Sequence, residues 1–348
     1  MDGPPPPGID ERELAHALSD SWGLELAGLR YEPKGFGSYH WIGATPGGSR
    51  RFVKLDHLED KPYLGGDPSS VLDGLEAAYG AAHRLRESGL AFVVAPLPTR
   101  GGRILMPFDP RWALTVFPFV EGEAGVWGTP GPVARRTRLV RTLAELHGAA
   151  APSGSALRHL GWDLPGRAML EAALDEVATP WSGGPFSEQA RGAVRAKVSV
   201  IREWLDSHDT LASTLAAAGL EAVVTHGEPH PGNVMSAGGE VRLIDWDTAA
   251  LAPVERDLWM FGADGDALDA YEVASGHAAD SAAVAFYRLT WALSDLALFV
   301  GALRREHGQN RVTEKTWTGL LAILAGSEPA PYGGLRPTRP MPGHPAGP

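Results

Sequence analysis

The chain has 348 residues, no cysteine and a formal net charge of −11 at neutral pH. This length allows one elaborated core or two lobes, and the lack of cysteine excludes disulfides, thiolate chemistry and cysteine-bearing zinc sites. A general nucleic-acid binder needs a basic face to neutralise phosphates, whereas this chain has a net negative charge. No nucleic-acid partner is therefore expected. It favours cationic ligands, with solubility alone as the alternative.

The two ends of the sequence are poor in residues that build a core. Residues 4–8 read PPPPG, and residues 326–348 are rich in proline and glycine. We therefore expect a flexible segment at 1–20 and a disordered tail at 326–348. The start has no secretory pattern, and no run of about 18 apolar residues offers a membrane span, so a cytoplasmic protein without a membrane partner is expected.

Residues 21–120 are expected to form a small lobe of short strands with one helix. LRYEPKGFGSYHWIGA places a glycine pair between strand-like stretches, and RRFVKLD, AFVVAPLP and RILMPF are further strand candidates. Apolar residues spaced three or four apart predict a helix over 69–88, with serines at its start and Gly89 at its end. TVFPFVEGEAG at 115–125 is expected to connect this lobe to the rest.

Residues 121–325 are expected to form a larger, mostly helical lobe. The helices predicted from apolar spacing cover 133–150, 167–178, 187–218, 255–274 and 280–304. Strand signals interrupt them only at 221–245. The fold class that we infer is α+β, with a β-rich lobe followed by a helical one.

The loop THGEPHPGNV at 225–234 combines two histidines, a glutamate and an asparagine with prolines and glycines. A glycine-containing turn follows between two apolar strands, so Asn233 and Asp245 should be neighbours at the open end of a hairpin. An amide oxygen beside a carboxylate suits Mg²⁺, which takes oxygen ligands and shares substrate phosphates. Glu228 precedes Asn233 on the same loop, close enough to address what the metal holds.

Two other interpretations of this loop are open. His226 and His230 are four residues apart, the spacing of a zinc pair on a helix, but Pro229 and Pro231 disfavour a helix and the order is not HExxH. The H-x-E start of zinc deaminases also needs cysteines, which this chain lacks. The second interpretation is a polar loop without chemistry on a non-catalytic scaffold.

The runs HGEPHPGNV, LIDWD and ERDLW resemble the aminoglycoside phosphotransferase family of small-molecule kinases. The usual loop of that family is H-G-D-x-x-x-x-N, followed by an I-D motif, and the matching positions here are His226, Gly227, Asn233, Ile244 and Asp245. The resemblance spans roughly residues 28–305. It implies a bilobal protein-kinase-like fold, ATP or GTP as phosphate donor, Mg²⁺, and a small-molecule hydroxyl as acceptor.

The resemblance also implies a role for each matched residue. It makes Glu228 the catalytic base, and Asn233 and Asp245 the ligands of Mg²⁺. It makes His226 a structural brace of the loop, and Asp257 in ERDLW a further support of the loop. An ordinary acid at a helix start explains Asp257 equally well.

Glu228 departs from the family pattern, which has aspartate at this position. The extra methylene moves the carboxylate about 1.5 Å outward, and misplacement on that scale can cost about 100-fold in rate. In phosphoryl transfer, however, the base chiefly orients the hydroxyl, and glutamate is ionised at neutral pH like aspartate. We expect a working base, with a nucleotide-binding pseudokinase as the alternative. Asp247 is expected to face solvent, or else to assist the metal.

In the same resemblance the first lobe carries the nucleotide. KGFGSYHW at 34–41 resembles the phosphate-covering loop, with Gly35 and Gly37 permitting close backbone approach and Ser38 offering a hydroxyl; a plain hairpin turn is the alternative. Lys54 lies inside an apolar strand, where an ammonium needs a partner. The resemblance makes Lys54 the contact of the α- and β-phosphates and pairs it with a helix glutamate.

Glu76, on the helix over 69–88, is our candidate for that glutamate, with Asp73 in reserve and a solvated helix charge as the alternative. Phe117 and Phe119 match the segment that binds adenine through its backbone, although core packing explains these aromatics equally well.

The acceptor is expected to be a small molecule, because no A-P-E motif or phosphorylatable loop follows the I-D motif. Acidic residues that would bind amino groups, or else form a solvated face, are Glu121, Glu123, Asp264, Asp266 and Asp269. IDWDTAALAPVERDLW is most similar to the spectinomycin phosphotransferase branch, which implies a cationic aminocyclitol as acceptor and a role in antibiotic resistance. Relatives that act on choline, homoserine, methylthioribose or fructosamines share the same catalytic parts, so a metabolite kinase stays an alternative.

Overall fold

The computed structural model describes residues 5–33, 38–154, 156–262 and 264–326. The chain divides into two compact units, each formed by separate stretches of sequence. The first contains the chain up to Gly125 together with 142–159 and 223–251, and the second contains 126–141, 160–222 and the chain from Ala252 onward. The loop and hairpin that we assigned to the helical lobe therefore belong to the same unit as the N-terminal strands.

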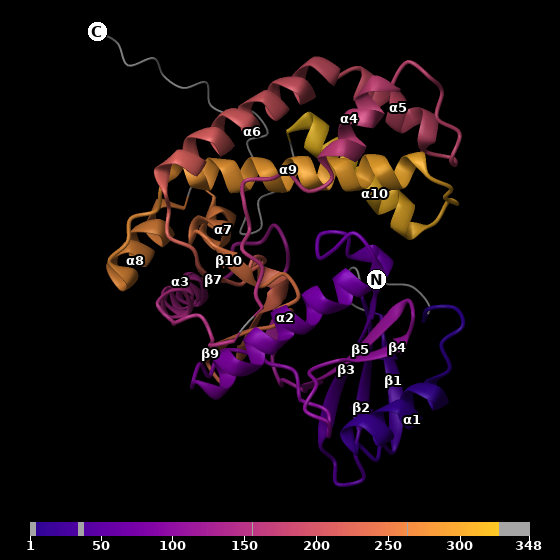
Figure 1. Ribbon diagram of the computed structural model, residues 1–348, viewed down its shortest axis with the longest axis vertical. Helices are drawn as coiled ribbons and strands as arrows, with labels where there is room; N and C mark the ends of the chain where they lie inside the picture. Colours follow the sequence, from indigo (N-terminus) through magenta and orange to yellow (C-terminus); the bar gives the residue numbers. More distant parts are fainter. Residues whose placement is uncertain (1–4, 34–37, 155, 263, 327–348) are drawn as a thin grey trace. The chain divides into compact units, whose positions relative to one another are not determined.

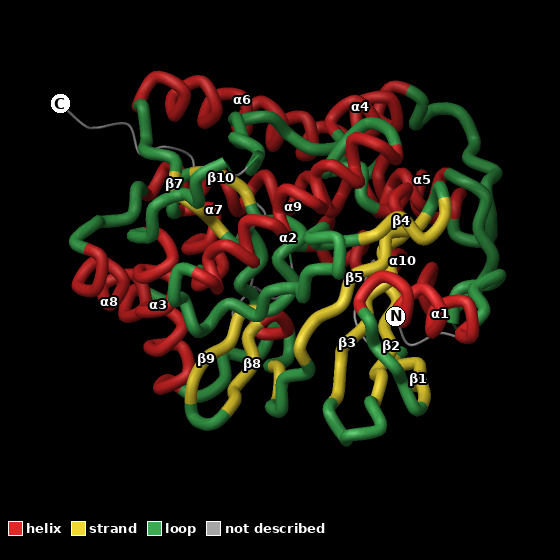
Figure 2. The backbone as a smooth tube through the Cα atoms, turned by 60° about the horizontal axis from the view of Figure 1, so that its bottom comes forward, coloured by secondary structure: helices red, strands yellow, loops and turns green. Residues whose placement is uncertain are grey.

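The first unit is built on an antiparallel sheet with the strand order β1-β2-β3-β5-β4 (Figure 2). Its strands are β1 (Gly28–Glu32), β2 (Ser38–Ala44), β3 (Arg50–His57), β4 (Met106–Asp109) and β5 (Trp112–Pro118). The central strand β3 is paired on both sides, so that Lys54 lies between His40 on β2 and Thr115 on β5. This double pairing fixes the register of Lys54 and sets which face of the sheet it shares with Asp56.

A helix that the sequence analysis did not predict belongs to the same unit. We expected residues 1–20 to be flexible, but α1 (Glu11–Trp22) is a helix whose Leu14 and Leu18 are fully buried with Trp41 of the sheet. The side chain of Asp10 accepts a hydrogen bond from the backbone of Arg12 and so caps the helix start. The expectation was wrong because apolar residues four apart follow the proline run directly.

Further elements of this unit are a long helix, a 3₁₀ helix and several short strands. The helix predicted over 69–88 is α2 (Pro68–Glu87), and β3 leads into the short 3₁₀ helix η1 (Leu58–Asp60). β6 (Glu123–Ala124), β8 (Val234–Ala237) and β9 (Glu240–Leu243) form a second sheet, and β7 (Val223–Thr225) pairs with β10 (Ala250–Ala252). The strand expected over 91–98 is absent from the described chain, which has only an isolated bridge from Val93 to Leu243 there.

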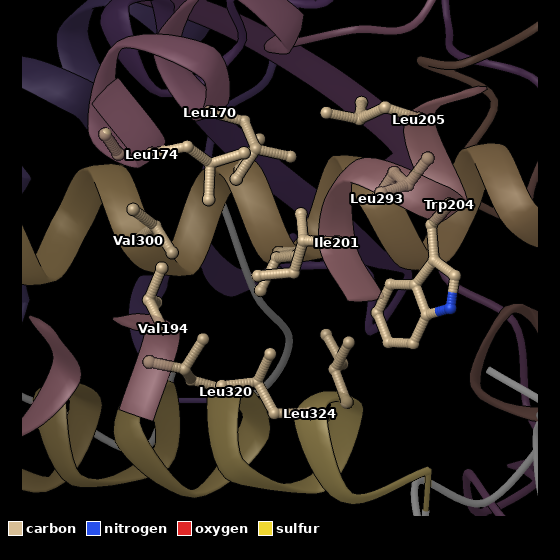
Figure 3. Packing of buried hydrophobic residues seen from close by; sticks show 14 of the residues in the cluster. Leu170, Leu174, Val194, Ile201, Trp204, Leu205, Leu293, Val300, Leu320 and Leu324 are labelled. Atoms are coloured by element: carbon tan, nitrogen blue, oxygen red, sulfur yellow. The ribbon is translucent and has the colours of Figure 1, made fainter. Parts of the chain in front are cut away.

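The second unit is helical, and its longest helix is α9 (Ser281–Arg304). The helices that pack with it include α4 (Arg167–Asp175), α5 (Ser187–Arg195), α6 (Val198–Ala218) and α10 (Arg311–Ala325) (Figure 1). Figure 3 shows the core between them, where Leu170, Ile201, Leu293 and Leu320 come from four different helices. The helix predicted over 187–218 is thus two helices, and α10 was not predicted.

Three further α-helices and a 3₁₀ helix are present in the described chain. α3 (Val133–His147) contains the boundary between the two units at residues 141 and 142. The helix predicted over 255–274 is interrupted, because α7 (Glu255–Leu258) and the 3₁₀ helix η3 (Trp259–Phe261) precede α8 (Gly265–Ser275).

In the described part of the chain, α9 is long and apolar enough to cross a membrane by length and composition, with a mean hydropathy of 1.4. Half of that apolar window is buried inside the protein. The core helix of a globular unit has the same properties, so α9 is weak evidence for a membrane span.

Candidate active site

The hairpin predicted after the catalytic loop is present as β8 and β9. Val234 pairs with Leu243, and one residue further on the backbone amide of Ile244 donates to the carbonyl of Asn233 at 3.0 Å. Asn233 and Asp245 therefore leave the two strands at the same end. The loop before them ends in the 3₁₀ helix η2 (Pro231–Asn233).

Asp245 adopts a strained backbone conformation. Its φ is 63°, and it is the one residue other than glycine with positive φ among the described residues. Such a conformation costs on the order of 1–3 kcal/mol and persists only where surrounding contacts enforce it. The contact here is an ion pair, because the Oδ1 atom of Asp245 lies 2.6 Å from the Nζ atom of Lys54, while 36% of the aspartate side chain stays exposed.

The oxygen atoms of Asn233 and Asp245 suit a hard metal cation. The amide nitrogen of Asn233 donates to the carbonyl of Glu228 at 3.0 Å, which leaves its amide oxygen as the ligand atom. The carboxylate of Asp245 is partly open to solvent, so water and phosphate oxygens can complete the shell. A carboxylate with an amide oxygen fits Mg²⁺. Binding of Mg²⁺ by Asn233 and Asp245 stays a prediction.

His226 is fully buried beneath the loop and is bonded through both ring nitrogens. Its Nε2 donates to the carbonyl of Ile244 at 2.9 Å, and its Nδ1 accepts from the backbone of Glu228 at 3.2 Å. Its ring lies against Trp246 with centroids 4.7 Å apart. These contacts are those of a brace between loop and hairpin, and they leave neither nitrogen for zinc. The described residues contain no group of three or more His, Cys, Asp or Glu that would hold a metal ion.

Glu228 is held by its backbone and is half-exposed at its carboxylate. Its amide is bonded to His226 and its carbonyl to Asn233. Its Oε2 atom lies 3.8 Å from Nε2 of His230, whose Nδ1 accepts from the backbone of Gly232 at 3.1 Å. In neutral His230 the proton is therefore on Nε2 and faces Glu228. This contact was not predicted from the sequence, in which His230 was considered only as a zinc ligand.

Lys54 is almost completely buried and has a different partner from the one expected. Its Nζ donates to the hydroxyl of Tyr79 on α2 at 2.9 Å and to Asp245. Glu76, three residues before Tyr79, instead accepts from the backbone of Ile104 at 3.1 Å. Burial alone would lower the pKa of Lys54, but the neighbouring carboxylates hold that pKa well above its ordinary value.

Asp247 is buried beside Lys54, so the expectation that it faces solvent was wrong. Its Oδ2 atom lies 3.3 Å from Nζ of Lys54 and 2.6 Å from Nζ of Lys61, a second buried lysine. Burial would raise the pKa of Asp247, but the two lysines hold it well below its ordinary range. Lys61 was not predicted from the sequence, because no periodic pattern or motif includes it.

The other nucleotide residues differ in how far the structure describes them. Gly35 and Gly37 lie outside the described residues. Ser38 is buried and donates to Asp56 at 2.6 Å, so its hydroxyl proton is already used. Phe117 on β5 is buried with its ring edge-on to Tyr79.

Phe119 follows β5, and the guanidinium carbon of Arg50 lies 3.9 Å from the centre of its ring. The contact of the Phe119 backbone with adenine stays a prediction. Arg50 also pairs with Glu121, and Arg136 of the second unit pairs with Asp264 at 3.1 Å. Two of the five acids considered either for binding amino groups or for a solvated face, Glu121 and Asp264, are therefore already in ion pairs.

Asp257 is fully buried at the start of α7, in the second unit. Its place in the first turn of this helix agrees with the alternative of an acid at a helix start, although the side chain is buried. Its support of the catalytic loop stays a prediction.

A buried lysine on a central antiparallel strand, paired with an aspartate at the end of a catalytic hairpin, defines the class of protein-kinase-like phosphotransferases. Solved structures agree with this fold. A spectinomycin phosphotransferase in complex with ADP and spectinomycin superposes with a TM-score of 0.73 at 16% identity, covering 91% of this chain and 97% of that one. The choline kinase LicA from Streptococcus pneumoniae gives a TM-score of 0.53 at 14% identity, covering 90% and 98%.

Residues 41–309 match the model of the phosphotransferase enzyme family, and the chain belongs to this family. A curated relative, Protein StrN of Streptomyces griseus, is 28% identical over 269 residues, which are 73% of this chain and 78% of StrN. The protein is accordingly an enzyme of the small-molecule kinase class with the α+β fold that the sequence predicted.

Proposed function

We propose that the protein transfers the γ-phosphate of ATP to a hydroxyl of a small cationic molecule. The observation that carries this proposal is the ion pair of buried Lys54 with Asp245, at the end of a hairpin that also presents Asn233. This arrangement brings together a cation for phosphate oxygens and oxygen ligands for a metal.

Each residue has one task in the proposed reaction. Lys54 contacts the α- and β-phosphates, and Asn233 and Asp245 hold Mg²⁺, which supplies charge neutralisation at the phosphate oxygens when bound. Glu228 accepts a hydrogen bond from the acceptor hydroxyl and takes its proton. The acceptor oxygen then forms a bond to the γ-phosphorus, the bond to the bridging β–γ oxygen breaks, and ADP leaves.

The class of acceptor is proposed from chemistry and from similar structures. The net charge of −11 favours cationic ligands. A structure with the same fold contains spectinomycin, and another is a choline kinase. An aminocyclitol or aminoglycoside is our first candidate, with a cationic metabolite such as choline as the second.

The test is a mass-spectrometric screen for a mass gain of one phosphoryl group. The protein is incubated with Mg²⁺ and ATP or GTP over a panel of aminoglycosides, spectinomycin, choline and the other metabolite acceptors. Asp245→Ala removes the proposed metal ligand, and Asp20→Ala, on the exposed face of α1, is the matched control. We expect a phosphorylated product with wild type and Asp20→Ala but not with Asp245→Ala. Product formation by Asp245→Ala at the wild-type rate would refute the proposed site.

A further inference from the structure

Lys54 has a counter-ion on its own strand. Asp56 follows two positions later on β3, so its side chain is on the same face of the sheet. Its Oδ1 atom lies 3.4 Å from Nζ of Lys54, and it is fully buried. Tyr79 connects the two groups a second time, because its hydroxyl accepts from Lys54 at 2.9 Å and donates to Oδ2 of Asp56 at 3.2 Å.

Asp56 is itself fixed from two sides. Ser38, directly opposite on β2, donates to its Oδ1 atom at 2.6 Å. The Nζ atom of Lys61 lies 3.1 Å from the same oxygen. A fully buried carboxylate needs such partners, since leaving its charge uncompensated is expensive.

Lys61 is also saturated by the protein. Its three ammonium protons have three acceptors, namely Asp247 at 2.6 Å, Asp56 at 3.1 Å and the hydroxyl of Tyr63 at 3.3 Å. No proton of this ammonium is left for a phosphate in this arrangement. Lys61 therefore influences the site indirectly, through its ion pairs with Asp56 and Asp247.

The charges of this cluster balance inside the protein. The buried cations Lys54 and Lys61 match the buried anions Asp56 and Asp247, and Asp245 is the additional, partly exposed carboxylate. When Asp245 turns toward a metal, Lys54 still has Tyr79, Asp247 and Asp56 within 3.4 Å. Tyr79 and Asp247 keep two of the three ammonium protons, and the proton that Asp245 releases becomes available for a phosphate oxygen.

We propose that Asp56 and Lys61 are positioning residues that hold Lys54 for the nucleotide phosphates, in place of a carboxylate of α2. Glu76 is not available for that task, because its Oε1 atom accepts from the backbone of Ile104 and its Oε2 atom lies 3.5 Å from Arg103. The inference rests on the proposed function, since Lys54 needs this support only if it contacts a nucleotide.

The experiment measures binding of Mg²⁺ with AMP-PNP by isothermal titration calorimetry, and of adenosine by competition. Asp56→Asn keeps the shape of the side chain and removes its charge, and Lys61→Met removes the balancing cation. We expect each to weaken the binding of Mg²⁺ with AMP-PNP at least tenfold and to change adenosine affinity less than twofold. Lys61→Arg should recover part of the loss. Tyr79→Phe, which keeps the ring and removes the connecting hydroxyl, should weaken nucleotide binding several-fold.

Glu76→Gln tests the alternative that the carboxylate on α2 supports Lys54. Asp20→Asn, at an exposed position of α1, is the matched control for loss of a carboxylate charge. Glu76→Gln should cost less than threefold, and a loss equal to that of Asp56→Asn would overturn the inference. An equal loss of adenosine affinity in Asp56→Asn would also overturn it, because the effect would then not act through the phosphates. If wild type binds neither ligand, the proposed function fails, and this inference fails with it.

Discussion

The substitution Glu228→Asp shortens the side chain by one methylene. It distinguishes a loop whose geometry requires glutamate from a loop that functions with either acid. The loop backbone cannot follow the change, because the amide of Glu228 is bonded to His226 at 3.2 Å and its carbonyl to Asn233 at 3.0 Å. In Glu228→Asp the carboxylate therefore retreats by about 1.5 Å and moves away from His230.

Displacement on this scale predicts a loss of about 10- to 100-fold in kcat, or about 1.4–2.7 kcal/mol in activation free energy. Glu228→Gln keeps the length and removes the base, so we expect a loss of about 10²- to 10⁴-fold. The KM for ATP should change little in both variants, because Glu228 addresses the acceptor and not the nucleotide.

The assay is steady-state phosphorylation of the acceptor found in the screen, with AMP-PNP binding as the control for an intact nucleotide site. A rate for Glu228→Asp at or above wild type would show that the loop is not fixed around glutamate. A rate for Glu228→Gln within threefold of wild type would refute the role of Glu228 as base.

Three further changes test other parts of the structure. Gly125→Ala places a Cβ 2.8 Å from Cβ of Pro231 and 2.9 Å from its carbonyl oxygen. We therefore expect the free energy of unfolding, measured by urea denaturation, to fall by about 1–3 kcal/mol and the activity to be reduced. An unchanged free energy of unfolding with unchanged activity would contradict this close approach. Leu293→Ala in the core of the second unit should lower the free energy of unfolding by about 2–5 kcal/mol with nucleotide affinity unchanged, and a loss below about 1 kcal/mol would show that this core is loosely packed. Chelation of divalent cations by EDTA should abolish phosphotransfer, and added Mg²⁺ should restore it; a rate that survives chelation would contradict the metal site.

The catalytic hairpin was predictable because its geometry is local. A short turn between two strands fixes which residues meet at the open end, so sequence spacing alone brought Asn233 and Asp245 together. Burial of Lys54 was also predictable, since a lysine within an apolar run requires partners. In each case the pattern contained the physical constraint.

The partner of Lys54 was not predictable in the same way. Glu76 and Tyr79 are three residues apart on α2 and so lie on neighbouring parts of one helix face, and only the position of the helix decides which of them reaches the lysine. Lys61 follows a 3₁₀ turn and belongs to no repeating pattern. Asp56 was visible within RRFVKLD, but which faces of β3 are buried depends on the full sheet.

The buried charges around Lys54 are better explained by function than by stability. Replacing a buried ion pair by apolar residues is often neutral or stabilising, so these four buried charges add little to the stability of the fold. These charges fix the position of Lys54, because Asp56 lies on a strand that is paired on both sides. A counter-ion on a rigid strand can hold the lysine in position for phosphate before a nucleotide arrives. The ion pair of Asp245 with Lys54 also opposes relaxation of the strained φ of Asp245.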